Sequence, residues 1–481
     1  MNILLIALPR YNSIPVLREE RCENITKSRL DTPATLLIMA SLLREKGHKI
    51  DFIDANGFDL SYDTISEEMI NKKFDCVIFS FCSQILNHDL EICKIAKKSN
   101  PNCITIGFNW YANYYAKGIL TEYSKFDIYV TGPTLSVIGN LIECLSENGN
   151  LGDVGGIAYR DGDGLIRLNN KIDSEIKFDD LPIPAYDLLP SFKPYYLVDP
   201  LLSPYALVYS GKGCPFGCIY CNVAKTKYSA RSVDNILKEL KILKKLGNVR
   251  YTWFFDEVFT INRKRVIEIC ERILEEDINI KWFCDSRVEL VDEELLKMMR
   301  KGGCIGISYG VESGSQKILD NMNKGNTVEQ AKKALIWTKK AHIPIHCNLI
   351  LGYIGEDEET LKETEYFIRE TLPETLQISI ISPKPGIKFT KLAIENGWIP
   401  KEPDWKEHLM MPLELENYEP FNLNLDIERK KLSRILNYNP KWWLSNINTL
   451  VRNHELIIPT AGILIRGLNQ KAKKALTIRN G

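Results

Sequence analysis

The strongest constraint on the fold is an alternation between short apolar runs and helical patterns, which occurs in two stretches of the chain. Apolar runs without polar alternation are typical of strands buried on both faces, and strands that alternate with helices predict a parallel sheet. We therefore predict an α/β fold that begins with a doubly wound, Rossmann-like domain. Its predicted strands span residues 3–8, 48–53, 76–81, 103–107 and 127–130.

The alternation resumes near residue 203 and continues to about residue 400. Successive βα units of this kind predict a partial (β/α)6 barrel of the TIM type. In such a barrel the functional residues lie at the carboxyl ends of the strands. The predicted strands are 206–210, 251–255, 280–284, 305–309, 345–351 and 376–381.

The composition of the chain changes outside these two stretches. Residues 161–164 read Asp-Gly-Asp-Gly between two strand-like runs, which predicts a hairpin, and a proline-rich connector follows. The strand pattern ends near residue 400, and residues 441–481 carry seven Lys or Arg against one Glu. The predicted parts are a first domain over 1–150, a hairpin and connector over 151–202, a barrel over 203–400, and a small helical, basic region over 401–481.

Charge and cysteine usage exclude several classes of protein. The 481 residues contain 62 Lys plus Arg and 62 Asp plus Glu, and this balance argues against a nucleic-acid-binding protein. Thirteen cysteines, irregularly spaced, do not form a disulfide framework and fit a reducing compartment. No apolar stretch reaches the roughly 18–20 residues that a transmembrane helix needs. We therefore predict a cytoplasmic protein.

One loop carries a clear chemical motif directly after the first barrel strand. Cys214, Cys218 and Cys221 follow the spacing Cys-x3-Cys-x2-Cys on a segment that contains Gly213 and Gly217. Three nearby thiolates satisfy three irons of a [4Fe–4S] cluster and leave the fourth iron open. Structural zinc is the main alternative, but it takes four ligands and no second cysteine pair or histidine lies nearby. The spacing favours the cluster over zinc and over buried free thiols.

This motif, with the aromatic Tyr220 before its third cysteine, resembles that of the radical S-adenosylmethionine (SAM) enzymes. The order of the two α/β stretches resembles the subgroup that has an N-terminal cobalamin (B12)-binding domain. The resemblance implies that SAM binds the open iron and is cleaved reductively to a 5′-deoxyadenosyl radical. It also implies a [4Fe–4S] cluster, SAM and cobalamin as cofactors.

The resemblance further implies SAM contacts at the carboxyl ends of the other barrel strands. The local patterns also allow plain structural roles: a helix N-cap for the Asp256-Glu257 pair, a solvated loop position for Arg287, and a simple turn at Pro385. The implied SAM-binding residues are Tyr220, Asp256, Glu257, Arg287, Glu312, Gly352 and Pro385.

Cobalamin binding by the first domain is supported less directly. Ligands bind a doubly wound sheet at the carboxyl edge of its strands, where Tyr11, Ser80 and Gly107 are the candidate contacts. Phe108 follows Gly107 where relatives carry a second glycine, and Thr131-Gly132-Pro133-Thr134 replaces a Gly-Glu-x-Glu-like segment. These departures leave open a degenerate domain that is kept for architecture or substrate binding.

Three functional hypotheses follow. The first is a cobalamin-dependent C-methyltransferase that acts on an unactivated carbon, and the second is radical oxidation, cyclisation or rearrangement without methyl transfer. The third is a non-enzymatic Fe–S binding module. The expected partners are a small-molecule or lipid-like substrate and a reductant such as flavodoxin or ferredoxin, with no nucleic acid. The basic C-terminal region, with Trp442 and Trp443, also suggests peripheral membrane contact as an alternative to a helical cap on the barrel.

Overall fold

The computed structural model describes residues 1–20, 22–110, 112–171, 176–197, 202–402, 404–410, 424–437, 439–442 and 444. The chain divides into two compact units, each considered by itself below. Apart from the residues that are not described, the first comprises Met1–Pro194, Leu207–Asn248 and Ser382–Glu419, and the second comprises Tyr195–Ala206, Val249–Ile381 and Pro420–Gly481. The division into four parts expected from the sequence stays a prediction.

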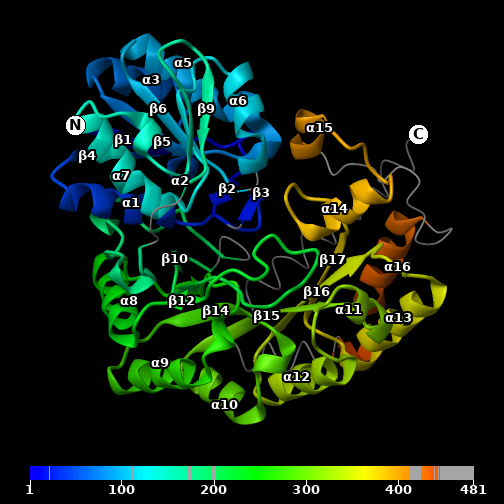
Figure 1. The fold of residues 1–481 in the computed structure, drawn as a ribbon. Coiled ribbons are helices and arrows are strands. Elements are labelled where there is room, and N and C mark those ends of the chain that lie inside the picture. Colours follow the sequence, from blue (N-terminus) through cyan, green and yellow to red (C-terminus); the bar gives the residue numbers. More distant parts are fainter. Residues whose placement is uncertain are drawn as a thin grey trace, which may run out of the picture. The chain divides into compact units, whose positions relative to one another are not determined.

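The first unit contains a seven-stranded sheet in the order β4-β1-β5-β6-β7-β8-β9 (Figure 1). The strands from β4 to β7 are parallel, which confirms the predicted doubly wound domain, and β8 and β9 form the predicted hairpin and extend the sheet antiparallel. Counted along the chain, the parallel strands have the order 2-1-3-4-5, whose switch point lies between β1 and β5. The strands are β1 (Asn2–Ala7), β4 (Lys49–Asp54), β5 (Cys76–Ser80), β6 (Ile104–Phe108), β7 (Ile128–Val130), β8 (Ile157–Arg160) and β9 (Ile166–Asn169).

Helices cover both faces of this sheet because its central strands are apolar on both sides. Leu4 and Ile6 of β1 share a core with α3, α5 and α6, whereas Ile3 and Leu5 share another with α1 and α7. Alternate residues of one strand therefore serve two layers. The helices are α1 (Ala34–Glu45), α2 (Ala55–Phe58), α3 (Tyr62–Asn71), α4 (Leu86–Asp89), α5 (Glu91–Ser99), α6 (Ala116–Glu122) and α7 (Thr134–Ser146).

A hairpin of β2 (Val16–Glu19) and β3 (Cys22–Ile25) lies between β1 and α1 and was not expected from the sequence. The Thr32-Pro33 pair is typical of an N-cap followed by a proline at the first helical position, but Thr32 does not cap the following helix. Helix α1 begins after Pro33 without a side-chain cap. The Thr32 hydroxyl instead accepts a hydrogen bond from the backbone N–H of Leu207 at 2.9 Å. This contact with a residue distant in sequence replaces the capping hydrogen bond to the first turn of the helix.

The remaining elements of the first unit belong to the stretches that carry and follow the cysteine motif, Leu207–Asn248 and Ser382–Glu419. Helix α8 is capped by Ser232, whose hydroxyl accepts the N–H of Asn235. The proline-rich connector packs onto this region, where the Tyr186 hydroxyl donates to Glu239 of α8 at 2.6 Å. These elements are β11 (Gly211–Lys212), β12 (Ser229–Ala230), α8 (Val233–Gly247), α14 (Lys388–Glu395) and α15 (Trp405–Met410).

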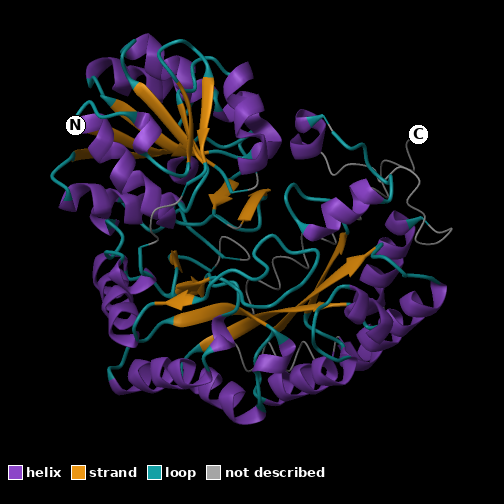
Figure 2. Cartoon of the chain, in the orientation of Figure 1, coloured by secondary structure: helices purple, strands orange, loops and turns teal. Residues whose placement is uncertain are grey.

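The other sheet has six strands in the order β10-β13-β14-β15-β16-β17, and those from β13 to β17 are parallel. The sheet is open, with β10 and β17 as its edges, so it is a partial barrel as predicted. Helices follow its strands in alternation (Figure 2). The strands are β10 (Tyr205–Val208), β13 (Tyr251–Phe254), β14 (Lys281–Ser286), β15 (Cys304–Glu312), β16 (Ile345–Leu351) and β17 (Thr375–Ile380). The helices are α9 (Arg263–Glu275), α10 (Glu293–Lys301), α11 (Gln316–Asn321), α12 (Val328–Lys340), α13 (Glu358–Thr371) and α16 (Leu425–Asn437).

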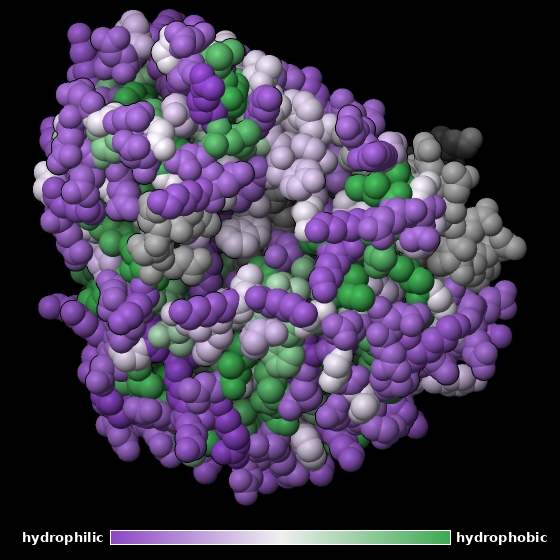
Figure 3. All heavy atoms as spheres, viewed as in Figure 1, coloured by the Kyte–Doolittle hydropathy of each residue, from purple (hydrophilic) through white to green (hydrophobic). Residues whose placement is uncertain are grey.

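On the face drawn in Figure 3, hydrophilic side chains cover most of the surface that the described residues form. None of the described helices combines the length and apolarity needed to cross a bilayer. The indole N–H of Trp442 donates to the carbonyl of Pro373 at 2.8 Å, just before the amino end of β17, so this contact does not test the predicted cap at the carboxyl ends of the strands. Trp443 and residues 445–481 lie outside the described residues, and the predicted membrane contact stays a prediction.

Candidate functional site

The cysteine motif lies on a loop that follows β11 and folds back on itself. Gly213 adopts a φ of +92°, and a Cβ there would lie 2.1 Å from the carbonyl oxygen of Lys227, so the position requires glycine. The backbone N–H of Cys214 donates to the hydroxyl of Thr226 at 2.9 Å. These contacts hold the first cysteine near the end of the same loop.

The donor set of this loop fits an iron–sulfur cluster. Cys214 and Cys218 are buried and Cys221 is half-buried. In the part of the chain that the structure describes, no three His, Cys, Asp or Glu side chains stand close enough together to hold a metal ion, so the thiols share one loop without converging on one point. Their chemistry still matches a cluster, because three thiols fall within one short loop and no fourth ligand of a zinc site accompanies them.

Two of the cysteines, Cys218 and Cys221, line a cavity of about 260 Å³. Asn222 also lines it, and its Nδ2 atom is shielded from solvent without a hydrogen-bond partner among the described residues. A buried donor without an acceptor is costly, so this atom marks a place for a thiolate, sulfide or ligand acceptor. Pro385 lies in the same wall, and Tyr220 is half-buried on the loop.

The β2–β3 hairpin contacts the residues that directly precede the cysteine loop. Glu19 of β2 accepts hydrogen bonds from the Tyr209 hydroxyl at 2.9 Å and from the Thr35 hydroxyl at 2.7 Å. The next residue, Glu20, pairs with Lys212 at 2.6 Å. Tyr209 and Lys212 directly precede the motif, so the hairpin anchors the strand that presents the cysteines.

The buried carboxyl of Glu19 predicts a pH-dependent stability. Burial raises the pKa of Glu19 from 4.5 to about 8. The folded chain therefore holds this proton more tightly than the unfolded chain. The contribution of the proton to the free energy of unfolding is complete below about pH 4.5, and it is lost as the pH rises through 8. In that window the loss approaches about 1.4 kcal/mol per pH unit. Glu19→Gln keeps the site neutral and should flatten this slope.

The measurement is the urea midpoint of the wild-type and Glu19→Gln chains at pH 5.5 and pH 8.5. The exposed Glu67→Gln substitution serves as the control and should leave the wild-type slope unchanged. Equal slopes for wild type and Glu19→Gln would contradict the prediction.

In the second unit, Glu312 stands at the carboxyl end of β15 in an unusual conformation. Its φ is +71°, a left-handed value that is rare outside glycine. Its carboxylate accepts the ammonium of Lys324 at 2.9 Å, and only 10% and 5% of the two side chains is exposed. Gly310 leaves room for this pair, because a Cβ there would lie 2.5 Å from Glu312 Oε1. A strained, buried carboxylate is thus held where the resemblance expects a SAM contact.

Arg287 joins the same cluster through the loop that carries Lys324. Its guanidinium donates to the backbone carbonyl of Lys324 and pairs with Glu289, and the residue is only 4% exposed. The alternative of a solvated arginine was therefore wrong. Lys324 links two predicted site residues, and the sequence reasoning missed it. The sequence signal was a lone Lys-Gly pair after a short helix, which by itself resembles an ordinary turn.

The remaining predicted SAM residues of the second unit also follow strands of its sheet. Asp256 is buried and Glu257 is half-buried directly after β13. Gly352 follows β16 with a φ of +80°, and its N–H donates to the carboxylate of Glu356. Glu356 is itself buried, which raises its pKa to about 7. The structure thus places a buried carboxyl, rather than open space, behind the Gly352 turn.

The carboxyl edge of the first sheet holds a narrow, polar cavity of about 20 Å³ beside the switch point between β1 and β5. Ser80 and Arg18 line it. Arg18 is buried, pairs with Asp89 at 2.7 Å and donates to the carbonyls that follow β1. Tyr11 packs edge-on against His88, with ring centroids 5.3 Å apart. Two of the predicted cobalamin contacts, Tyr11 and Ser80, are therefore at this edge.

Gly107, the third predicted cobalamin contact, lies within an aromatic core. A Cβ there would meet the ring of Phe126 at 2.6 Å and that of Phe79 at 2.9 Å. Phe108 packs into the other core, with α1 and α7. Phenylalanine side chains thus fill the space beside Gly107 on one face, and Phe108 occupies the opposite one.

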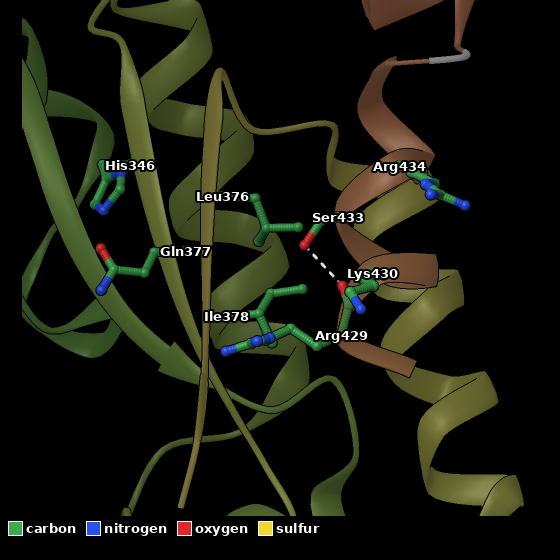
Figure 4. Close-up of a pocket in the computed structure, with 8 residues that line it drawn as sticks. All are labelled: His346, Leu376, Gln377, Ile378, Arg429, Lys430, Ser433 and Arg434. Atoms are coloured by element: carbon green, nitrogen blue, oxygen red, sulfur yellow. Dashed lines mark hydrogen bonds between the residues drawn. The ribbon is translucent and has the colours of Figure 1, made fainter. Parts of the chain in front are cut away.

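A larger and more open cavity of about 540 Å³ lies in the second unit between β17 and α16 (Figure 4). His346 and Gln377 lie on the sheet side, and Arg429, Lys430 and Arg434 are presented by α16. None of the residues predicted from the sequence lines it.

Comparisons with known proteins agree with the motif and the fold. Residues 208–368 match the model of the Radical SAM superfamily. An uncharacterised methyltransferase of Pyrococcus horikoshii is 29% identical over 97% of this chain and 98% of its own length. The anaerobic magnesium-protoporphyrin IX monomethyl ester cyclase of Rubrivivax gelatinosus is 30% identical over 76% of this chain, which spans 66% of the cyclase.

Two solved structures share the fold. The radical SAM methyltransferase TsrM of Kitasatospora setae, solved with cobalamin and a [4Fe–4S] cluster, superposes with a TM-score of 0.66 at 15% identity, over 91% of this chain and 85% of its own. The cobalamin-dependent SAM radical enzyme OxsB, solved with aqua-cobalamin, superposes with a TM-score of 0.63 at 21% identity, over 79% of this chain and 53% of its own. At these identities the likeness concerns the fold.

Proposed function

The chain belongs to the radical SAM superfamily, and on that premise we propose that it is a cobalamin-dependent C-methyltransferase that acts on an unactivated carbon. The observation that carries the proposal is the closed loop with Cys214, Cys218 and Cys221, two of which line a cavity. We assign these three thiolates to the cluster. A cluster held by these residues would supply the one-electron reduction on which radical SAM chemistry depends.

The protein's own residues position and shield that chemistry. Gly213 and Thr226 fix the loop, and the buried positions of Cys214 and Cys218 keep water from two of the thiolates. Asn222 Nδ2 is a donor for one sulfur or ligand atom. Tyr220 and Pro385 are assigned to SAM binding in this unit.

In the second unit we assign SAM binding to residues at the carboxyl ends of the strands. The ion pair with Lys324 orients the carboxylate of Glu312, which can accept hydrogen bonds from hydroxyl or amino groups. The Gly352 turn allows close backbone approach. The assigned residues are Asp256, Glu257, Arg287, Glu312 and Gly352.

Support for methyl transfer comes from relatives named as methyltransferases, one of which aligns along nearly the whole chain. Support for cobalamin comes from the 2-1-3-4-5 sheet and its polar edge, where we assign Tyr11 and Ser80 as contacts. The phenylalanines around Gly107 favour the second candidate function, radical chemistry without methyl transfer. Gly107 is accordingly the weakest of the predicted contacts. A small-molecule substrate and a reducing partner such as flavodoxin or ferredoxin complete the proposal.

The test is product analysis of the full chain, purified without oxygen, reconstituted with iron and sulfide and supplied with hydroxocobalamin. With SAM and a reductant, 5′-deoxyadenosine should form, and SAM should perturb the electron paramagnetic resonance signal of the reduced cluster. A retained corrin absorbance and S-adenosylhomocysteine as a second product support methyl transfer. Deoxyadenosine without either would favour the second candidate, and absence of an iron–sulfur signal would contradict both.

A further inference from the structure

The β2–β3 hairpin lies at the carboxyl edge of the first sheet, where a doubly wound fold binds its ligands. The hairpin follows β1, and the Arg18 guanidinium donates to the carbonyls of Leu8 and Pro9 just beyond that strand, at 2.9 Å each. The backbone N–H and carbonyl of Val16 bond the side chain of Asn56, in the helix after β4, at 3.0 and 2.9 Å. The hairpin thus binds the ends of two neighbouring strands.

The same hairpin also bonds the segments that follow β5 and β6. Arg18 pairs with Asp89 after β5 at 2.7 Å. Glu23 accepts the backbone N–H of Ser83, after β5, and the side-chain amide of Asn109, after β6, each at 2.8 Å. Since β4, β1, β5 and β6 are consecutive in the sheet, one hairpin spans the ends of four adjacent strands.

The space that remains behind the hairpin is too small for the nucleotide tail of a cofactor. The cavity between β2 and the ends of β1, β4 and β5 measures about 20 Å³. Such a volume holds one water, whereas pockets for organic ligands begin near about 300 Å³. On the face of the sheet that α5 and α6 cover, the rings of Phe79 and Phe126 fill the space beside Gly107. The described residues therefore leave no buried path for a nucleotide at either place.

The backbone donors of this edge are already bonded within the chain. A phosphate bound to a doubly wound sheet is held by backbone N–H groups beyond the strands. Here the N–H of Cys82 donates to Asp89 at 2.7 Å, and the N–H of Ser83 donates to Glu23. A phosphodiester would have to displace two carboxylates, whose charge has the same sign as its own.

The corrin ring of cobalamin needs no such crevice, because a flat macrocycle can lie against the outer surface of the loops. We propose that the first unit holds corrinoids by the ring alone and accepts them whether or not they carry a nucleotide tail. Tyr11 is half-buried in the turn before the hairpin, whereas Ser80 is buried in the small cavity, so Tyr11 is the more accessible of the two assigned contacts. This inference rests on the proposed function and deepens it by naming the class of cofactor.

The test compares hydroxocobalamin with diaquacobinamide, which has the same corrin ring without the nucleotide tail. Binding to the reconstituted full chain is measured by corrin absorbance in equilibrium dialysis, at about 0.15 M salt so that the difference in ligand charge is screened. Cobinamide should bind no more than about fivefold more weakly than cobalamin. A larger preference for cobalamin would overturn this inference and leave the proposed function standing.

A substitution at Tyr11 shows which part of the ligand the unit contacts. Tyr11→Ala should weaken the binding of both corrinoids by the same factor, at least about twofold, because the ring is common to the two. Tyr366→Ala, which replaces an exposed tyrosine of α13 in the second unit, is the control and should weaken neither. A loss confined to cobalamin would assign Tyr11 to the tail and overturn the inference.

Hydrogen exchange shows whether the hairpin stays in place. The N–H groups of Val16 and Ser83, which bond Asn56 and Glu23, should stay protected when cobalamin binds. Loss of their protection would mean that the cofactor displaces the hairpin, which would overturn the inference. If neither corrinoid binds, this inference and cobalamin-dependent methyl transfer both fail, whereas formation of 5′-deoxyadenosine tests the radical chemistry separately.

Discussion

Replacing Cys218 by alanine is expected to abolish the iron–sulfur absorbance of the reconstituted protein and to slow SAM cleavage by at least about 100-fold. Two thiolates leave a second iron without a protein ligand, and a cluster held so loosely is lost. Among the three cysteines, Cys218 is the most informative position to replace, because its side chain is buried on the folded loop and also lines the cavity. The measurement is iron and sulfide content, with the yield of 5′-deoxyadenosine.

Cys144→Ala provides the control. Cys144 is a half-buried cysteine of α7, outside the motif, and its substitution should leave iron content and SAM cleavage at the wild-type level. A Cys218→Ala protein that retains the full cluster signal would remove the basis of the proposed chemistry. Bound zinc in place of iron and sulfide would do the same.

The second large effect is expected at Lys324. Lys324→Met leaves the carboxylate of Glu312 buried without its cation, and breaking a buried pair in this way costs about 3–5 kcal/mol. Thermal unfolding should shift downward, and SAM should bind at least about tenfold more weakly because the Glu312 side chain is no longer held. The same loop anchors Arg287, whose guanidinium donates to the Lys324 carbonyl.

Two comparisons isolate the ion pair. Adding Glu312→Gln to Lys324→Met should recover most of the lost stability without restoring SAM affinity, because the uncompensated charge is gone but the ligand contact is not rebuilt. Lys332→Met breaks a more exposed pair with Glu370, in which 24% and 57% of the two side chains is exposed, and should cost less than about 1 kcal/mol. If Lys324→Met is as mild as Lys332→Met, the pair has no positioning role.

The sequence predicted the two sheets because strands that are buried on both faces appear in the sequence as continuous apolar runs. A strand such as β1 is apolar from Ile3 to Ala7, since its alternate residues enter different cores. The cysteine motif was predictable for a related reason: three ligands of one group must come from a short, glycine-bearing loop. In both cases the physical requirement acts within a few neighbouring residues.

The features that the sequence did not predict depend on partners far away in the chain. The β2–β3 hairpin mixes apolar and charged residues, and it is held by the pair of Arg18 with Asp89 and by the hydrogen bond from Tyr209 to Glu19. Lys324 is a lone lysine until the fold brings it to Glu312. No local sequence pattern indicates these contacts between distant residues, so only the three-dimensional structure reveals them.

The first unit also has a consequence for how the enzyme matures. This unit is formed by three separate stretches of the sequence, and the last of them contains Phe389 and His408. Phe389 binds the cysteine loop through Ile219, and His408 bonds both Tyr115 and the carbonyl of Pro383. A ribosome therefore has to deliver more than four-fifths of the polypeptide before the thiols gain their final surroundings. A shortened chain that ends after the first sheet therefore lacks two of the three stretches that make up this unit.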